Sequence, residues 1–337
     1  MKTISRRTVL SAAGALAGTQ LLPRRAQAAE FTVRLGHDVP ESHSIHKRLV
    51  EAAQEISKQT KERVEIQIFS NSQLGSSVDM LSQVRSGALD MMTVGTPLGN
   101  AVPLAGISAL AFAFPNIERA WEAMDGDLGR HVRQVVSKQL RIVAFDRIWD
   151  FGGFRQITTS TKPINQPDDL KGMKIRLPVS PLYTSTFQAL GASPVSMNFV
   201  EVYSALQTEI ADGQENPLAL INTGRFYEVQ RFCSLTAHMW EPVTLVANPR
   251  AWDNVPKDAQ EVVRRVMGEA ALRQRNDSEQ ENLTLQKEMS QKGLVFNNVD
   301  RSAFQRALRA AGYYEQWKQK FGEEAWQHLK PYSEALP

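Results

Sequence analysis

Alternation between strand-like and helix-like hydrophobic patterns is the feature that most restricts how this chain folds. Three short apolar runs typical of β-strands occupy residues 31–35, 64–69 and 89–94. Between them, apolar residues recur at three- and four-residue spacing, as they do along one face of a helix. A strand–helix–strand–helix–strand order favours a mostly parallel sheet with helices on its faces. We therefore predict an α/β fold.

A long helical pattern indicates that the fold has two lobes. The pattern begins at Pro256 and ends at Gly293. At 1.5 Å per residue it predicts a helix of about 55 Å, which is longer than one small lobe is wide. The 337 residues of the chain also exceed the roughly 250–300 at which single hydrophobic cores stop growing. We expect two lobes braced by this helix, with several chain crossings and no linker between them.

The first 28 residues have the pattern of an export signal. Arg6 and Arg7 precede an apolar run over residues 9–22, and Ala26-Gln27-Ala28 is a small-residue cleavage site. The apolar run is too short for a helix that spans a bilayer. The paired arginines resemble a twin-arginine signal, and an ordinary Sec signal is the alternative. We predict a periplasmic protein cleaved near Ala28.

The charge balance excludes several classes of function. The net charge of +3 arises in the signal, which holds five basic residues and no acid, so the mature chain has a net charge of −2. Such a chain lacks the basic surface that nucleic acids require. A single cysteine, Cys233, excludes an internal disulfide and is expected in the core.

Sequence signatures of catalysis are absent. The chain contains no G-x-S-x-G, H-E-x-x-H, Walker or G-x-G-x-x-G motif, and we expect no cofactor and no metal. His37, His43 and His46 lie close together, and we interpret them as a solvated loop and helix start rather than a metal site. His238 is expected to be a hydrogen-bonded structural residue. An enzyme with acid–base groups among Asp150, Glu215 and His238 is the alternative.

Arg176 is the first candidate for ligand binding. It stands at the end of a predicted strand over residues 173–177, four residues before a helix N-cap at Ser180. Helix N-termini favour anions, and a guanidinium group adds a planar fork that matches a carboxylate. This arrangement indicates a site for a small organic acid.

Two neighbouring motifs connect Arg176 with a known family. The runs FVEVYSALQ over residues 199–207 and DGQENP over residues 212–217 resemble the substrate-binding proteins of tripartite ATP-independent periplasmic (TRAP) transporters, of the C4-dicarboxylate/sialic-acid-binding type. The resemblance continues through residues 72–75, 87–90 and 172–178 and the segment around Arg155. It covers essentially the whole mature chain in the expected order.

The resemblance implies a two-lobed, periplasmic-binding-protein-like fold. Its mixed, mostly parallel sheets are linked by strand crossings, and a long helix spans both lobes. On this basis residues 30–152 and 242–281 form the first lobe, and residues 153–241 and 282–337 form the second. The ligand binds in the cleft, and the lobes close over it.

The resemblance also implies which residues contact the ligand. Arg176 is the main carboxylate anchor, and Arg155 is a second arginine at the site. An amide, an aromatic wall and three positions in the first lobe complete it: Asn216, Phe199, Asp38, Ser77 and Gly95. Sialic-acid binders carry an acidic side chain at the position of Gly95, so sialic acid is not the expected ligand.

Four residues beside the expected crossings leave two interpretations open. They either line the cleft or pack at the crossings: Trp149, Asp150, Trp240 and Glu241. If they line the cleft, their carboxylates and indole rings suit a polyhydroxylated acid such as a uronate or aldonate. Aromatic, dicarboxylic and branched hydroxy acids are the alternatives.

The implied function is ligand capture and delivery, not catalysis. The partners implied are the integral membrane subunits of a TRAP transporter, and no ATPase. A role as the ligand-presenting component of a sensor system is the alternative.

Overall fold

Two mixed β-sheets form the centre of the molecule. The computed structural model describes residues 29–333 and 336, so the predicted export signal lies outside the described residues. The first sheet has the strand order β2-β1-β3-β10-β4, and the second has the order β11-β9-β5-β8-β6-β7. Five of the nine strand pairings among the described residues are parallel. The predicted α/β class with mixed sheets is confirmed.

Four consecutive strands and one later strand form the first sheet, and the remaining strands form the second. Those of the first sheet are β1 (Phe31–Gly36), β2 (Val64–Phe69), β3 (Met91–Val94), β4 (Val143–Asp150) and β10 (Pro242–Ala247). Those of the second sheet are β5 (Arg155–Thr159), β6 (Lys174–Leu177), β7 (Ser193–Ser196), β8 (Gly213–Pro217), β9 (Phe232–Leu235) and β11 (Val295–Asn298).

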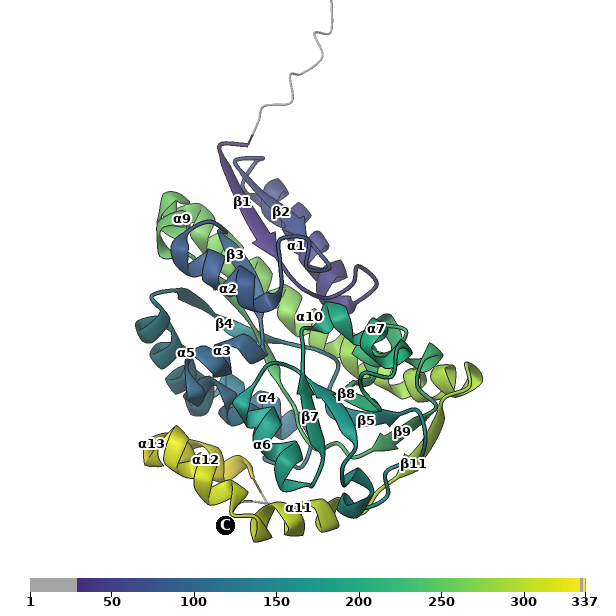
Figure 1. The fold of residues 1–337 in the computed structure, drawn as a ribbon. Helices are drawn as coiled ribbons and strands as arrows, with labels where there is room; N and C mark the ends of the chain where they lie inside the picture. Colours follow the sequence, from purple (N-terminus) through teal and green to yellow (C-terminus); the bar gives the residue numbers. More distant parts are fainter. Residues whose placement is uncertain (1–28, 334–335, 337) are drawn as a thin grey trace, which may run out of the picture.

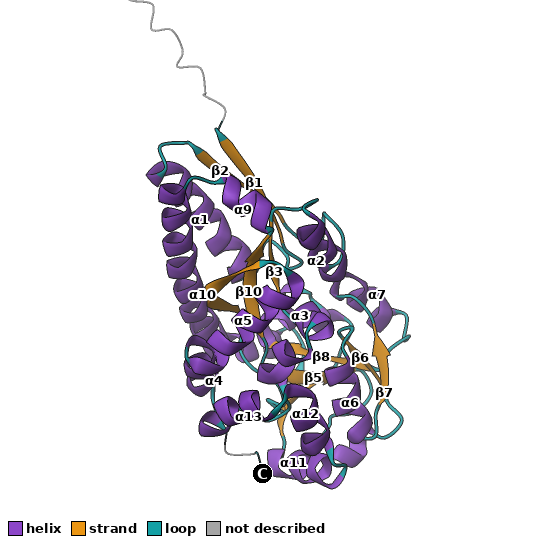
Figure 2. Cartoon of the chain, turned by 90° about the vertical axis from the view of Figure 1, so that its left-hand side faces the viewer, coloured by secondary structure: helices purple, strands orange, loops and turns teal. Residues whose placement is uncertain are grey.

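Helices cover both sheets (Figure 2). The α-helices are α1 (Ser44–Gln59), α2 (Ser77–Ser86), α3 (Thr96–Ala101), α4 (Ile117–Asp125), α5 (Asp127–Leu140), α6 (Pro181–Ala189), α7 (Val202–Gln207), α8 (Leu218–Thr223), α9 (Pro249–Asn254), α10 (Lys257–Gln291), α11 (Arg301–Ala310), α12 (Tyr313–Phe321) and α13 (Glu323–Leu329). The 3₁₀ helices are η1 (Pro103–Ala109), η2 (Pro167–Leu170), η3 (Phe199–Glu201), η4 (Phe226–Glu228) and η5 (Lys330–Tyr332).

The chain passes between the two sheets after β4 and again before β10. It leaves the first sheet after β4 and returns with β10, which pairs antiparallel with β3 and β4. The long helix α10 has 35 residues and packs against α1 and β4 at one end and α8 at the other (Figure 1). It therefore braces elements on both sides of the crossings, as the sequence predicts.

The C-terminal helices also contact both sides. Helix α12 packs against α6 and η1, while α13 packs against α5. In Figure 1 these helices lie at the opposite end of the molecule from β1 and β2. A smaller core beneath the second sheet contains Cys233, which is buried as predicted.

The predicted solvated loop of histidines is wrong. His37 and His43 are both buried. The Nε2 atom of His43 lies 3.1 Å from the carbonyl oxygen of Phe151, beside the first crossing, and its Nδ1 accepts from the backbone N–H of Ile45. This arrangement needs a neutral ring with its proton on Nε2, because a proton on Nδ1 would face another donor. Burial lowers the pKa of His43 to about 4 and that of His37 to about 3.

We predict that His43 makes the fold sensitive to acid. Its folded-state pKa lies below the ordinary value of 6.5, so its contribution to stability is complete above pH 6.5 and is lost as the pH falls towards 4. Relative to His43→Asn, the free energy of unfolding of the wild type should fall by about 1.4 kcal/mol per pH unit across this range. Asparagine retains an acceptor for the N-cap. Urea denaturation at several pH values measures the difference, and parallel profiles for the two proteins would contradict the assignment.

Candidate ligand-binding site

A cavity between the two sheets is lined by eight of the eleven predicted ligand-binding residues. They are Asp38, Ser77, Gly95, Arg155, Arg176, Phe199, Asn216 and Glu241. The sequence analysis missed other residues that line it, among them Phe151, Thr96, Asn198 and Leu220. Residues predicted from separate segments of the sequence therefore line one cavity.

Strand order explains why the residues from the second sheet meet. Strand β8 lies between β5 and β6, antiparallel to β5 and parallel to β6. The carboxyl ends of β6 and β8 therefore lie at the same edge of the sheet as the amino end of β5. Arg176, Asn216 and Arg155 occupy these three ends. Positions 21 to 61 residues apart in the sequence thus form one cluster.

The first sheet contributes in the same way. Asp38 follows β1, Gly95 follows β3, and Ser77 begins α2 after a capping box formed by Ser76 and Asp79. The hydroxyl of Ser77 donates to a carboxylate oxygen of Asp38, whose pKa is raised by burial. Both sheets thus present strand ends to the cavity, where ligands of α/β proteins usually bind.

The guanidinium group of Arg155 bonds to the protein through Nε and Nη2, and its Nη1 lies 3.9 Å from Oε2 of Glu241. It is buried, and its Nη2 lies 2.8 Å from Oε1 of Glu215, while its Nε donates to Oε2 of the same carboxylate. Nη2 also donates to Oδ1 of Asn216 at 2.8 Å. Burial would raise the pKa of Glu215, but the charge of Arg155 holds it below its ordinary value. Arg155 is therefore neutralised and held rigidly in place.

Glu215 and His238 support Arg155 from behind. His238 is buried, with Nε2 3.2 Å from Oε2 of Glu215 and Nδ1 2.7 Å from Oγ1 of Thr236. Neither Glu215 nor His238 lines the cavity described above. The hydrogen-bonded structural role predicted for His238 is confirmed. Glu215 was named only as an acid–base alternative, although the run DGQENP marked its position.

Arg176 differs from Arg155 because its charge lacks an acidic partner. Only 2% of its surface is exposed, and its Nε and Nη2 donate to the carbonyl oxygen of Met197 at 3.2 and 2.7 Å. Within the described residues, no carboxylate forms an ion pair with it. Burial lowers its pKa to about 10, so it remains positively charged at neutral pH. A buried charge without a counter-charge is costly, and an anion in the cavity would compensate it.

Glu241 and Gly95 define the other wall of the cavity. Oε2 of Glu241 accepts from Oγ1 of Thr96 at 2.9 Å and from the hydroxyl of Tyr183 at 3.1 Å. Burial raises the pKa of Glu241 to about 7. A Cβ atom at Gly95 would lie 2.8 Å from the ring of Phe151 and 3.2 Å from the carboxyl carbon of Glu241. The position therefore accommodates no side chain unless its neighbours move.

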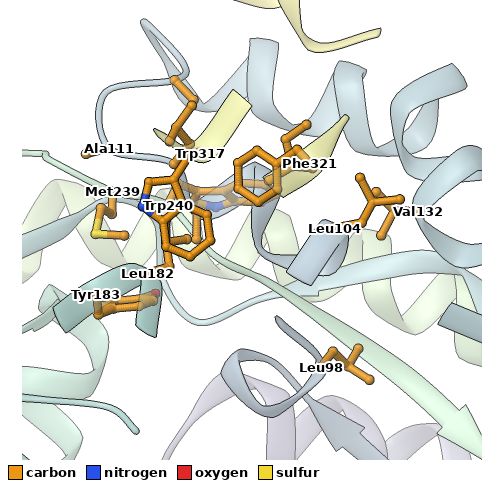
Figure 3. Packing of buried hydrophobic residues seen from close by; sticks show 14 of the residues in the cluster. Leu98, Leu104, Ala111, Val132, Leu182, Tyr183, Met239, Trp240, Trp317 and Phe321 are labelled. Atoms are coloured by element: carbon orange, nitrogen blue, oxygen red, sulfur yellow. The ribbon is translucent and has the colours of Figure 1, made fainter. Parts of the chain in front are cut away.

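Three of the four residues at the crossings do not line this cavity. Trp149 is buried in the core beneath the first sheet, and Trp240 packs among apolar side chains that include Trp317 and Leu182 (Figure 3). Oδ1 of Asp150 accepts from the backbone N–H groups of Gly152 and Gly153 at 2.9 and 2.8 Å. Of the two interpretations left open, packing at the crossings rather than lining the cleft therefore applies to Trp149, Asp150 and Trp240. Only Glu241 reaches the cavity.

Comparison with known proteins identifies the family. Residues 35–320 match the model of the bacterial extracellular solute-binding protein family 7. The chain belongs to this family. A solute-binding protein of Roseobacter denitrificans is 34% identical over 86% of its own length and 84% of this chain. The 2,3-diketo-L-gulonate-binding periplasmic protein YiaO of Escherichia coli is 31% identical over 85% of its length and 83% of this chain.

Solved structures agree with this assignment. A TRAP periplasmic solute-binding protein of Roseobacter denitrificans with bound L-galactonate has a TM-score of 0.83 and 31% identity, covering 90% of this chain and 99% of that one. A TRAP periplasmic protein of Sulfurospirillum deleyianum with bound succinate has a TM-score of 0.85 and 28% identity, covering 90% of this chain and all of that one.

Membership of this family defines the general role of the chain. It is an extracytoplasmic solute-binding protein that works with the membrane subunits of a TRAP transporter and is not an enzyme. None of the described helices is both long and apolar enough to cross a membrane.

We predict that Glu215→Gln strongly destabilises the protein, because it removes the carboxylate that binds the buried Arg155 directly and leaves only Glu241, whose Oε2 lies 3.9 Å from Nη1 of Arg155. Loss of one partner of a buried ion pair costs about 3–5 kcal/mol. The matched control is Glu228→Gln, which removes the partner of the exposed Arg225 and should leave stability nearly unchanged. Urea denaturation of both variants measures the difference. Equal stability of the two variants would show that Glu215 does not neutralise Arg155.

Proposed function

We propose that this chain captures a sugar acid, a uronate or an aldonate, in the cavity between its sheets and presents it to its TRAP membrane subunits. The observation that carries the proposal is the buried guanidinium of Arg176, which has no acidic partner among the described residues and lines the cavity. A carboxylate supplies the missing charge and matches the planar fork.

The proposed roles follow from the surroundings of each residue. Arg176 anchors the carboxylate, and Arg155, fixed by Glu215, together with Asn216 orients it. Phe199 forms an apolar wall, and the centroid of its ring lies 5.8 Å from that of Phe226. Polar groups on the opposite side can bond to the hydroxyls of a sugar acid: those of Asp38, Ser77 and Glu241.

The ligands bound in solved relatives support a sugar acid, and one of them, a dicarboxylate, is the alternative. A TRAP protein of Sulfitobacter binds β-D-galacturonate, and that of Roseobacter denitrificans binds L-galactonate. The protein of Sulfurospirillum deleyianum binds succinate, a dicarboxylate. Burial raises the pKa of both Asp38 and Glu241, and a second carboxylate beside them would be repelled by whatever part of them is ionised, whereas hydroxyls can bond to either protonation state.

We also propose the lobe boundaries as the sequence predicts them. Residues 30–152 and 242–281 would move as one lobe, and residues 153–241 and 282–337 as the other. In support, every strand of the first sheet falls in the first set and every strand of the second sheet in the second. The proposed closure bends the chain at the crossings around Gly152 and Glu241.

We predict that Arg176→Ala abolishes binding of sugar acids in titration calorimetry. Arg176→Lys, which keeps the charge and loses the fork, should bind at least ten times more weakly than the wild type, since a charge-assisted hydrogen bond contributes about 1.5–3 kcal/mol. The control is Lys174→Ala, which removes an exposed cation from the same strand and should bind normally.

The ligand panel contains D-galacturonate, L-galactonate and succinate. Tight binding of either sugar acid and weak binding of succinate is the expected result for the wild type. A preference for succinate would indicate that the ligand is a dicarboxylate rather than a sugar acid, and it would leave the proposed role of Arg176 as the carboxylate anchor unchanged. Unchanged affinity of both Arg176 variants would refute the anchor itself.

We further propose that export uses the twin-arginine route, with cleavage after Ala28. The motif at Arg6 and Arg7 supports this proposal. In cells that make the full-length protein, replacing both arginines by lysine should retain the precursor in the cytoplasm. N-terminal sequencing of the periplasmic wild type should begin at Ala29. Undiminished export of the double variant would indicate the Sec route.

A further inference from the structure

A cluster of three metal-ligating side chains lies on the surface, away from the ligand cavity. His131 comes from α5, and Glu324 and His328 come from α13. Their potential ligand atoms all lie within 4.8 Å of one another. Nδ1 of His131 is 3.5 Å from Oε1 of Glu324, and the two imidazole rings are 5.6 Å apart at their centroids. None of the three lines the cavity around Arg176.

The packing of the two helices holds these side chains together. Glu324 and His328 are four residues apart and therefore project from the same face of α13. The neighbouring apolar residues are buried at the contact between α13 and α5: Leu128, Val132, Ala325 and Leu329. The backbones that carry the three ligands are thus positioned by the core rather than by the cluster itself.

We propose that His131, Glu324 and His328 form a Zn²⁺ site that clamps α13 onto α5. Two imidazoles and one carboxylate are a ligand set that zinc uses, and water completes such a site. Zinc–ligand distances of about 2.0–2.2 Å would bring the three atoms closer than they lie now, which needs only side-chain rotation. The side chain of Glu324 is 74% exposed and that of His131 is 20% exposed, so the ion can enter from solvent.

Zinc at this site would hold the C-terminal helix α13 in place. Helix α13 packs on α5, while the preceding α12 packs on α6 and η1. A zinc ion at the cluster would link His131 to Glu324 and His328 through metal–ligand bonds and so fix α13 on α5. Zinc binds only the folded arrangement, and it should therefore raise the melting temperature. No metal was expected because the sequence contains no metal-binding motif, and these three residues fall in two segments separated by more than 190 positions.

The test is zinc titration of untagged, chelator-treated protein with residues 29–337. Calorimetry should show one zinc ion bound per chain, and zinc in hundredfold excess over its dissociation constant should raise the melting temperature by several degrees. His131→Ala, His328→Ala and Glu324→Gln should each weaken binding at least tenfold. Glu323→Gln, which changes the adjacent carboxylate outside the cluster, should bind zinc as the wild type does.

Controls separate this site from other effects. The variants should melt at the wild-type temperature in the absence of zinc, because the cluster lies outside the apolar contact. Zinc binding retained in the His131→Ala/His328→Ala double variant would overturn the proposal and indicate another site, such as the adjacent pair His37 and His46. Absence of binding to the wild type at 100 µM zinc would also overturn it.

Discussion

Two guanidinium groups buried at one edge of the second sheet impose the constraint on which the site depends. Removing a charge from water is expensive, and only a well-placed opposite charge compensates for it. Glu215 provides that charge for Arg155. Arg176 has no ion-pair partner within the described residues. In the proposed function, a bound carboxylate supplies that partner.

In the proposed function, the ligand must reach this edge of the sheet. The two chain crossings beside it are therefore important, because the cavity can open only if the chain bends there. At the first crossing, Asp150 binds two backbone N–H groups of the turn, and Gln274 from α10 bonds to both the backbone N–H and the carbonyl oxygen of Asp150. Asn282 of α10 adds a bond to the carbonyl oxygen of Gly152. In the proposed closure, a defined turn of this kind, braced by one long helix, would let the two sheets change their separation without loss of their internal structure.

Motifs predicted the part of the site that comes from strand ends. Arg155, Arg176 and Asn216 occur in segments with enough pattern to be recognised, and all three line the cavity. The residues beside the crossings carried no such signal. Trp240 and Glu241 are adjacent in the sequence, yet Trp240 faces the core and Glu241 faces the cavity. Side-chain direction within an irregular crossing depends on packing, which periodicity does not report.

The sequence by itself determined the types of element, their order, and caps such as Ser76 and Asp79, because these depend on interactions between near neighbours. It also determined the family, through runs of consecutive residues. Only the tertiary structure decided which distant groups meet. Glu215 reaches Arg155 across 60 positions, and His131 meets His328 across nearly 200. Such contacts depend on how sheets and helices pack, and packing is a property of the whole chain.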